Sequence, residues 1–371
     1  MKIERISVYS VAIPFKPLGS IWVDRRRPDH LDSTIVAIQA DNGLIGFGES
    51  CPIGAVYLPA FAGGLRAGID VMAGALIGEN PTDIDAIYSV MDGVLTGHVH
   101  AKAAIDIACW DLFGKSTGLS ISDLMGGRLL DLVPAYASIP LSDSAQMCKT
   151  LEDRRQDGFQ RFQIKVGGNV REDIDRVNTL LADDDSDDVF MVDANRGWAK
   201  DDALRVVKAL DHIDCYIEQP CASYRACLSI RRRARHPVIL DEVIDSVTDL
   251  SRAIEDDALD GLVIKITHAG GLTPARLMRD ICLAHGIKVR IEDTAGSEVT
   301  RAAQAQLAAA TPENVQLGSY TFINDMAPVA NNAPKLREGA LHLNNDPGLG
   351  LDVDLTALGD PVAVYTRGDC V

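Results

Sequence analysis

The feature that most constrains the fold is a series of short apolar segments that recur from about residue 132 onward and mostly end in a charged side chain. The first segment ends near Ser138, and VQLGSY is an eighth candidate. Between them, the runs FQIK, VFMVD, CYIE, PVILD, LVIK and VRIED end at Lys165, Asp193, Glu218, Asp241, Lys265 and Asp293. Consecutive ends lie about 23 to 28 residues apart, which is the length of one strand, one loop and one helix. Eight such units predict a closed barrel of parallel strands.

The chain before the barrel has a different pattern. Residues 1 to about 50 alternate apolar and polar side chains, and Asp41, Asn42 and Gly43 supply a turn between two such runs. Residues from about 60 to 126 then place apolar side chains at helical spacing. Strands followed by helices predict a separate α+β domain in front of the barrel.

Composition narrows the class of partner and the compartment. The formal net charge of −17 disfavours nucleic acid and anionic membranes as partners, because the summed field would repel both. No apolar run reaches the roughly 18 residues of a membrane span, and the first residues, MKIERISVYSVAIPFKP, lack the apolar core of a signal peptide. The eight cysteines show no paired metal or redox spacing. These observations predict a cytoplasmic protein with reduced cysteines, and they leave a small molecule as the expected partner.

Three carboxylates end successive strands of the predicted barrel. Asp193, Glu218 and Asp241 would converge at the C-terminal ends of the strands, the face that carries the active site in such barrels. Three carboxylates cannot all ionise close together without a cation, so a hard divalent metal is expected, with Mg²⁺ as the default. The alternative is that each carboxylate caps the following helix.

Two lysines end the second and sixth strands. Lys165 and Lys265 would face each other across a closed barrel, over a substrate held at the metal. A lysine near a metal can act as a base, so the pair could remove a proton on one side of a carbon and deliver one on the other. The alternative is that each lysine only forms an ion pair with a metal-ligand carboxylate.

Several motifs resemble the enolase superfamily, specifically its muconate lactonizing enzyme subgroup. They are VDAN, IEQP, LDE, the strand that ends in Lys165, IKITHAGGLT, and residues 103–127, which are similar to the superfamily marker at the junction of capping domain and barrel. The resemblance covers nearly the whole chain. It implies a (β/α)₇β barrel over residues 129–352 and an α+β capping domain over residues 1–128, completed by residues 353–371.

The resemblance also implies a site and a chemistry. One Mg²⁺ per subunit would be held by Asp193, Glu218 and Asp241, with Asn195 and Glu242 of the same motifs beside them. Members of the superfamily abstract a proton next to a carboxylate and stabilise the resulting enediolate. A homo-oligomer is expected from the relatives. A non-enzymatic binding module is disfavoured, because neither a metal-ligand carboxylate nor a lysine is missing.

One departure from the family pattern and three short segments are expected to shape the substrate pocket. Many members carry a lysine two residues before the base on the second strand, and here that position is Gln163. After the seventh strand, Asp293 could hold a substrate ammonium, and Glu292 is expected to point the other way along the strand. The remaining candidate pocket residues are Trp22, Cys51 and Tyr57 in two capping-domain loops and Thr294 and Ala295 after Asp293. Ordinary loop packing is the alternative for the three loop residues.

Within the subgroup, the pattern most resembles members that act on proline derivatives. The expected reaction is dehydration of cis-3-hydroxy-L-proline to Δ¹-pyrroline-2-carboxylate, because two opposed lysines suit an anti elimination. A 2-epimerisation of proline is expected as a side activity. The alternatives are a 2-epimerase of proline or hydroxyproline betaine and a dipeptide epimerase. A sugar-acid dehydratase is a weaker competitor, since such relatives use a histidine on the later strands and His268 is only a loop residue after Lys265.

Overall fold

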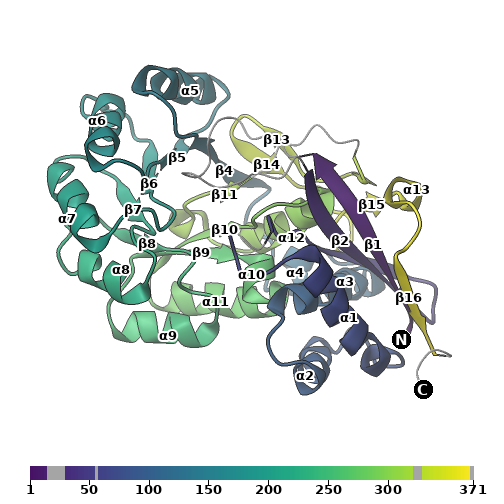
Figure 1. The fold of residues 1–371 in the computed structure, drawn as a ribbon. Coiled ribbons are helices and arrows are strands. Elements are labelled where there is room, and N and C mark those ends of the chain that lie inside the picture. The colour runs from purple at the N-terminus through teal and green to yellow at the C-terminus, as the bar shows by residue number, and fades with distance from the viewer. Residues whose placement is uncertain (15–29, 55–56, 321–327, 368–371) are drawn as a thin grey trace.

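The computed structural model describes residues 1–14, 30–54, 57–320 and 328–367 (Figure 1). Its larger part is a barrel of eight parallel strands, β4 to β11, in which a helix or helix pair follows each of the first seven. The strands are β4 (Leu132–Ile139), β5 (Arg161–Lys165), β6 (Val189–Asp193), β7 (Tyr216–Glu218), β8 (Val238–Leu240), β9 (Gly261–Lys265), β10 (Lys288–Glu292) and β11 (Ser319–Tyr320). The helices are α5 (Ser144–Gln156), α6 (Val170–Leu181), α7 (Lys200–Ala209), α8 (Tyr224–Arg231), α9 (Val247–Glu255), α10 (Ile266–Ala269), α11 (Leu272–Ala284) and α12 (Glu298–Ala309). The predicted (β/α)₇β barrel is confirmed.

The barrel closes between its last and first strands. Strand β11 pairs in parallel with β4, and Gln316 just before it forms a bridge with Val289 of β10. The interior below the site is filled by an apolar layer of one inward side chain from each of five strand segments, Tyr136, Met191, Ile239, Val263 and Leu317. Because side chains alternate along each strand, the next inward positions toward the C-terminal ends are free to carry polar groups.

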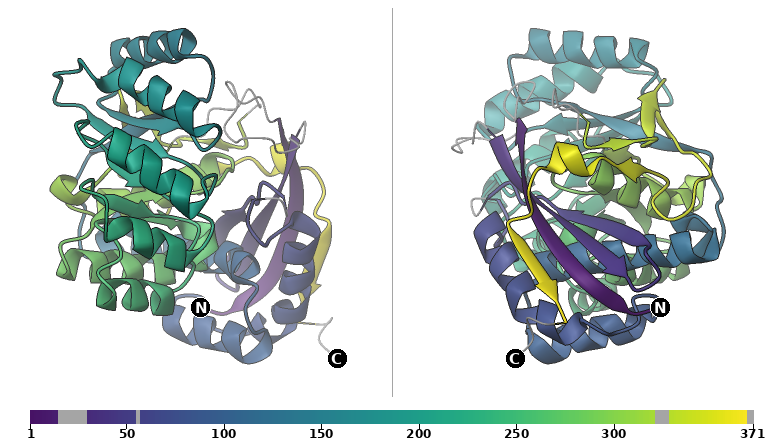
Figure 2. Two further views of the ribbon diagram at one scale, coloured as in Figure 1. Left: turned by 60° about the vertical axis from the view of Figure 1, so that its left-hand side comes forward. Right: turned by 90° about the vertical axis from the view of Figure 1, so that its right-hand side faces the viewer.

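The capping domain is an antiparallel sheet covered by helices. Its strand order is β16 (Ala363–Thr366), β1 (Ile3–Pro14), β2 (His30–Ala40) and β3 (Ile45–Ser50). Helices α1 (Ala62–Leu76), α2 (Ile84–Val94) and α3 (Val99–Thr117) pack beside it. A Cβ at Gly48 would collide with the Ala104 carbonyl oxygen, so the glycine lets α3 lie directly on β3. Strand β16 pairs with β1, and Figure 2 shows these two ends of the chain side by side.

The remaining elements are short. They are α4 (Ile121–Leu124), the 3₁₀ turn Glu313–Val315, β12 (Ala330–Asn331), β13 (Lys335–Arg337), β14 (Ala340–His342), β15 (Asp352–Val353) and α13 (Leu355–Leu358). Strand β14 pairs antiparallel with β4 and so extends the barrel sheet beyond its closed ring. No helix in the part of the chain that the structure describes is long and apolar enough to cross a membrane.

Buried carboxylates of the capping domain bind backbone groups of the barrel. Glu49 accepts hydrogen bonds from the backbone N–H groups of Ser297 and Thr300 at the start of α12. Asp106 of α3 likewise accepts from the Thr273 N–H at the start of α11, 3.0 Å away. A carboxylate at a helix N-terminus satisfies otherwise unpaired N–H groups and complements the helix dipole. These contacts fix the capping domain over the barrel mouth.

Two buried histidines also meet at this junction. The rings of His100 on α3 and His268 on α10 lie 5.9 Å apart, and the Ser50 hydroxyl lies 3.2 Å from His100 Nδ1. The other three ring nitrogens have no hydrogen-bond partner among the described residues. Burial lowers the pKa of His100 to about 4, and burial together with the charges of His100 and Lys265 lowers that of His268 to about 3.

This pair predicts a loss of stability in mild acid. An unfolded histidine titrates near pH 6.5, so below that pH the unfolded chain binds protons that the folded protein resists. The contribution of the neutral histidine pair to the free energy of unfolding is therefore present above about pH 6.5 and falls progressively toward pH 4. We expect the double variant His100→Gln/His268→Gln to lose less free energy of unfolding between pH 7 and pH 5 than the wild type, by about 1.4 kcal/mol per histidine and pH unit below 6.5.

Urea unfolding at pH 7 and pH 5 measures the free energy of unfolding of both proteins. The carboxylates are the same in the two proteins, so their contributions cancel when the two losses are compared. The change His285→Gln at an exposed position is the matched control and should leave the pH dependence as in the wild type. An identical loss in the double variant and the wild type would contradict the prediction.

Candidate active site

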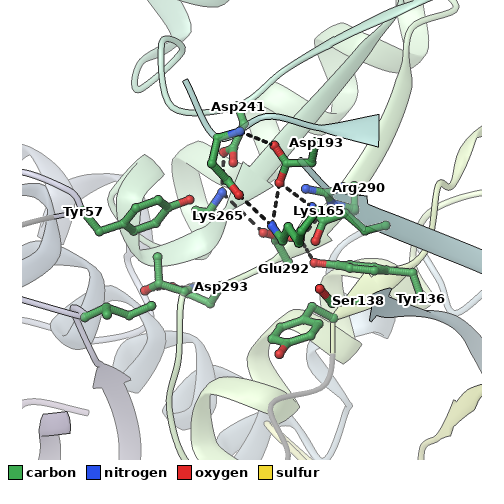
Figure 3. A pocket seen from close by; sticks show the side chains of 15 residues that line it. Tyr57, Tyr136, Ser138, Lys165, Asp193, Asp241, Lys265, Arg290, Glu292 and Asp293 are labelled. Carbon is green, nitrogen blue, oxygen red and sulfur yellow. Dashed lines mark hydrogen bonds and ion pairs between the residues drawn. The ribbon is translucent and has the colours of Figure 1, made fainter. Parts of the chain in front are cut away.

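A cavity of about 50 Å³ opens at the C-terminal ends of the barrel strands, beneath a capping-domain loop (Figure 3). Strands β4, β5, β6, β9 and β10 and the segments after them supply most of its walls, and Ile53 and Tyr57 come from the capping domain. The side chains that line it are mainly charged or hydroxylic, which is unusual for a simple packing defect. The cavity is therefore the candidate active site.

The three carboxylates expected at the metal lie on neighbouring strands. Asp193 and Glu218 are register partners at the ends of β6 and β7, and Asp241 directly follows β8. Their exposed fractions are 0%, 0% and 3%. They do not cap the following helices: α8 and α9 begin with caps from Ser223 and Ser246, and α7 has no side-chain cap. The helix-capping alternative is thereby excluded.

The charge of this site is not balanced by its side chains. Burial and the neighbouring charge of Glu218 raise the pKa of Asp193 to about 6, and burial also raises the pKa of Asp241. Five carboxylates lie in and beside the cavity against three basic side chains: Asp193, Glu218, Asp241, Glu292 and Asp293 against Lys165, Lys265 and Arg290. The difference is two negative charges, which one divalent cation would neutralise.

The donor set fits Mg²⁺, which prefers carboxylate oxygens. Among the described residues no three carboxylate, imidazole or thiol groups are already arranged as a metal-binding cluster. Each of the three carboxylates instead accepts a hydrogen bond from a basic side chain. A carboxylate has about four lone-pair sites, so such a bond leaves acceptor capacity for a cation.

The two lysines lie where the barrel topology requires, on strands four places apart in a ring of eight. Lys165 Nζ lies 2.6 Å from Asp193 Oδ2 and 2.9 Å from Asn195 Oδ1. Lys265 Nζ forms an ion pair with Asp241 and lies 3.3 Å from Glu292 Oε1. Burial alone would lower the pKa of Lys265, but the charges of Asp241 and Glu292 outweigh it and raise that pKa. The expected ion pairing is thus present, and both amines also line the cavity.

The segment after β10 differs in part from expectation. Glu292 was expected to point away from Asp293, yet both line the cavity. The strand ends at Glu292, so the alternation of side chains no longer applies to the next residue. Asp293 accepts hydrogen bonds from the Thr267 and Thr294 N–H groups, each 2.8 Å away, and burial raises its pKa to about 6.

The other candidate pocket residues fall into two groups. Gln163, Tyr57, Thr294 and Asn195 line the cavity, and the Tyr57 ring centroid lies 5.8 Å from Lys265 Nζ. Cys51 and Ala295 belong to an apolar cluster between the capping domain and the barrel, and they are not among the lining residues.

Two further candidates remain, Glu242 and Trp22. Glu242 is not among the lining residues; its Oε1 accepts a hydrogen bond from Asn195 Nδ2 at 3.4 Å, and burial with the charge of Asp241 raises its pKa to about 8. Trp22 lies outside the described residues.

Several cavity residues were not anticipated, among them Arg290, Tyr136 and Tyr320. Arg290 and Tyr136 contact Glu292 at the cavity floor, and Tyr320 stacks on Tyr136 with ring centroids 5.3 Å apart. Arg290 precedes Glu292 by two positions and so shares its face of the strand, which is the signal that could have found it.

The chain is similar to known proteins along nearly its whole length. Residues 27–126 match the family described as mandelate racemase / muconate lactonizing enzyme, N-terminal domain, and residues 146–357 match the enolase C-terminal domain-like family. The chain is 43% identical to cis-3-hydroxy-L-proline dehydratase of Roseibium aggregatum, covering 99% of this chain and 100% of that one. It is 29% identical to N-succinyl-L-Arg/Lys racemase of Bacillus cereus, covering 95% and 96%. A crystal structure of an enolase superfamily member from Roseovarius nubinhibens complexed with magnesium has a TM-score of 0.94 at 35% identity, covering 99% and 100%.

Proposed function

Because the chain belongs to the mandelate racemase/muconate lactonizing enzyme family of the enolase superfamily, we propose that it is a Mg²⁺-dependent dehydratase of cis-3-hydroxy-L-proline. The observation that carries the proposal is the pair of buried amines, Lys165 and Lys265, on opposite strands of one cavity. The high identity to a dehydratase of this substrate supports the choice among reactions of the family.

In the proposed reaction, one lysine removes the α-proton of the substrate. In cis-3-hydroxyproline the α-proton and the hydroxyl lie on opposite ring faces, so the second lysine is on the correct side to protonate the departing hydroxyl. The Cα–H and C–O bonds break, a carbon–carbon double bond forms, and water leaves. The enamine product then tautomerises to Δ¹-pyrroline-2-carboxylate.

The site offers groups for each charge of the substrate. Asp193, Glu218 and Asp241 would hold Mg²⁺, which when bound supplies positive charge to stabilise the enediolate formed at the substrate carboxylate. Asp293 and Glu292 line the cavity and supply acceptors for the ring amine. Tyr57 covers the mouth beside Lys265, which reduces access of bulk water to the reacting carbon.

A second candidate is 2-epimerisation of a proline betaine. Three tyrosines line the cavity, Tyr57, Tyr136 and Tyr320, and aromatic faces bind quaternary ammonium groups. One face of Tyr136 is already occupied, since the Arg290 guanidinium lies 4.8 Å from its ring centroid. The incomplete cage makes this the weaker candidate.

Incubation of the Mg²⁺-loaded protein in D₂O with four compounds tests the proposal. We expect cis-3-hydroxy-L-proline to lose its hydroxyl and form Δ¹-pyrroline-2-carboxylate, observed by NMR, while L-proline only exchanges its α-proton for deuterium. Deuterium incorporation confined to trans-4-hydroxy-L-proline betaine or an L-Ala dipeptide would move the substrate to that of an epimerase. No reaction with any of the four would overturn the proposal.

A further inference from the structure

Arg290 is a buried cation in the floor of the active site. Its side chain points into the barrel from β10, is 0% exposed, and lies 3.6 Å from Met191 Sδ in the apolar layer below. Removing a guanidinium from water is costly, so its N–H groups must meet anions there. The fork formed by Nη1 and Nη2 binds both oxygens of Glu218, with an Nη1–Oε2 distance of 2.6 Å, and Nε donates to Glu292 Oε2 at 2.8 Å.

Gln163 on β5 also binds Glu218 and connects it to Asp193. Its Nε2 donates to Asp193 Oδ2 at 3.0 Å and to Glu218 Oε1 and Oε2 at 3.0 and 3.2 Å. It precedes Lys165 by two positions, so both side chains leave β5 on the cavity face. The amide therefore bridges two neighbouring carboxylates, and its N–H donors are used there.

We propose that Arg290 and Gln163 are positioning residues that orient Glu218 and Asp193 for Mg²⁺, an inference that rests on the Mg²⁺ site of the proposed function. A two-point Arg–carboxylate pair fixes the plane of the carboxylate as well as its place. With Arg290 on one side of Glu218 and Gln163 bridging to Asp193, neither carboxylate can rotate without losing a hydrogen bond. The role of Gln163 is then to hold metal ligands, not to bind the substrate carboxylate.

Arg290 also connects the metal ligands to a lysine. Its Nε and the Tyr136 hydroxyl both donate to Glu292 Oε2, and Glu292 Oε1 faces Lys265. A single guanidinium thus spans Glu218 and the carboxylate beside Lys265. Arg290 therefore fixes the position of Glu218, a proposed metal ligand, relative to Glu292, the carboxylate beside Lys265.

Calorimetric titration of the metal-free protein with Mg²⁺ tests the inference in Arg290→Lys and Gln163→Leu. Arg290→Lys keeps the charge but loses the two-point geometry, and Gln163→Leu loses the bridge. We expect the Kd for Mg²⁺ to rise about 10- to 100-fold in each variant, as is usual when a partner of a metal ligand is lost. Saturating Mg²⁺ should restore most of kcat, because neither residue transfers a proton in the proposed reaction.

The control is Lys288→Met on the same strand, whose Nζ binds the Asn314 carbonyl oxygen outside the site, and its Kd should equal that of the wild type. Circular dichroism shows which variants fold, and Gln163→Leu carries the test if Arg290→Lys does not. A wild-type Kd in the folded variants would overturn the inference alone. Absence of Mg²⁺ binding to the wild-type protein would overturn the metal site of the proposed function, and this inference with it.

Discussion

Replacing Lys165 or Lys265 with alanine is expected to lower kcat for dehydration of cis-3-hydroxy-L-proline by about 10²- to 10⁴-fold, the usual contribution of a positioned acid or base. Each amine is nearly buried and lines the cavity from its own side, so neither can replace the other. The same change at Lys208, which is exposed on α7, is the matched control and should leave kcat unchanged.

Exchange of the α-proton in D₂O separates the roles of the two lysines. The variant that lacks the base should lose both α-deuteration and dehydration. The variant that lacks the acid should still exchange the α-proton of the substrate but not release the hydroxyl. Dehydration within tenfold of the wild type in either variant would contradict the two-lysine assignment.

Loss of the divalent cation should lower turnover about as strongly as loss of either lysine. Chelation by EDTA, or the near-isosteric change Asp241→Asn, is expected to reduce turnover at least about 10³-fold, because charge stabilisation of several kcal/mol is lost. Only the chelated wild type should recover when Mg²⁺ is restored, and Mg²⁺ should raise the Tm of the wild type but not that of Asp241→Asn.

The change Asp187→Asn removes the same charge from an exposed loop and is the control for net charge. Full turnover of the wild-type protein in excess EDTA, with no metal detected by elemental analysis, would contradict the metal dependence.

The barrel and the family could be predicted from the sequence because their signals are local. A charged residue at the end of an apolar run, repeated at one spacing, marks Lys165, Asp193, Glu218 and Lys265 without any knowledge of tertiary structure. The observed strand ends agree with the predicted ones within one residue, and the family comparisons confirm the enolase superfamily resemblance.

The remainder of the site depends on contacts between distant segments. The alternation in VRIED places Arg290 on the same face of the strand as Glu292, but it does not indicate that this face is turned toward Glu218, because a charged residue inside a strand is expected at the surface. Cys51 precedes the lining residue Tyr57 by six positions, yet it packs in the seam with Ala295, a contact set by how the capping domain docks. Both placements follow from contacts between segments far apart in the sequence, which neither periodicity nor motif spacing can predict.

The pairing of β16 with β1 constrains the order in which the protein can be completed during synthesis. Strand β1 leaves the ribosome before the barrel strands, but its partner at residues 363–366 is made only after them. Until then one edge of β1 has unpaired backbone groups, a feature that in other proteins promotes association between chains. The capping domain therefore reaches its final form only after the barrel sequence has been translated, although its own helices and three of its four strands are encoded before the barrel.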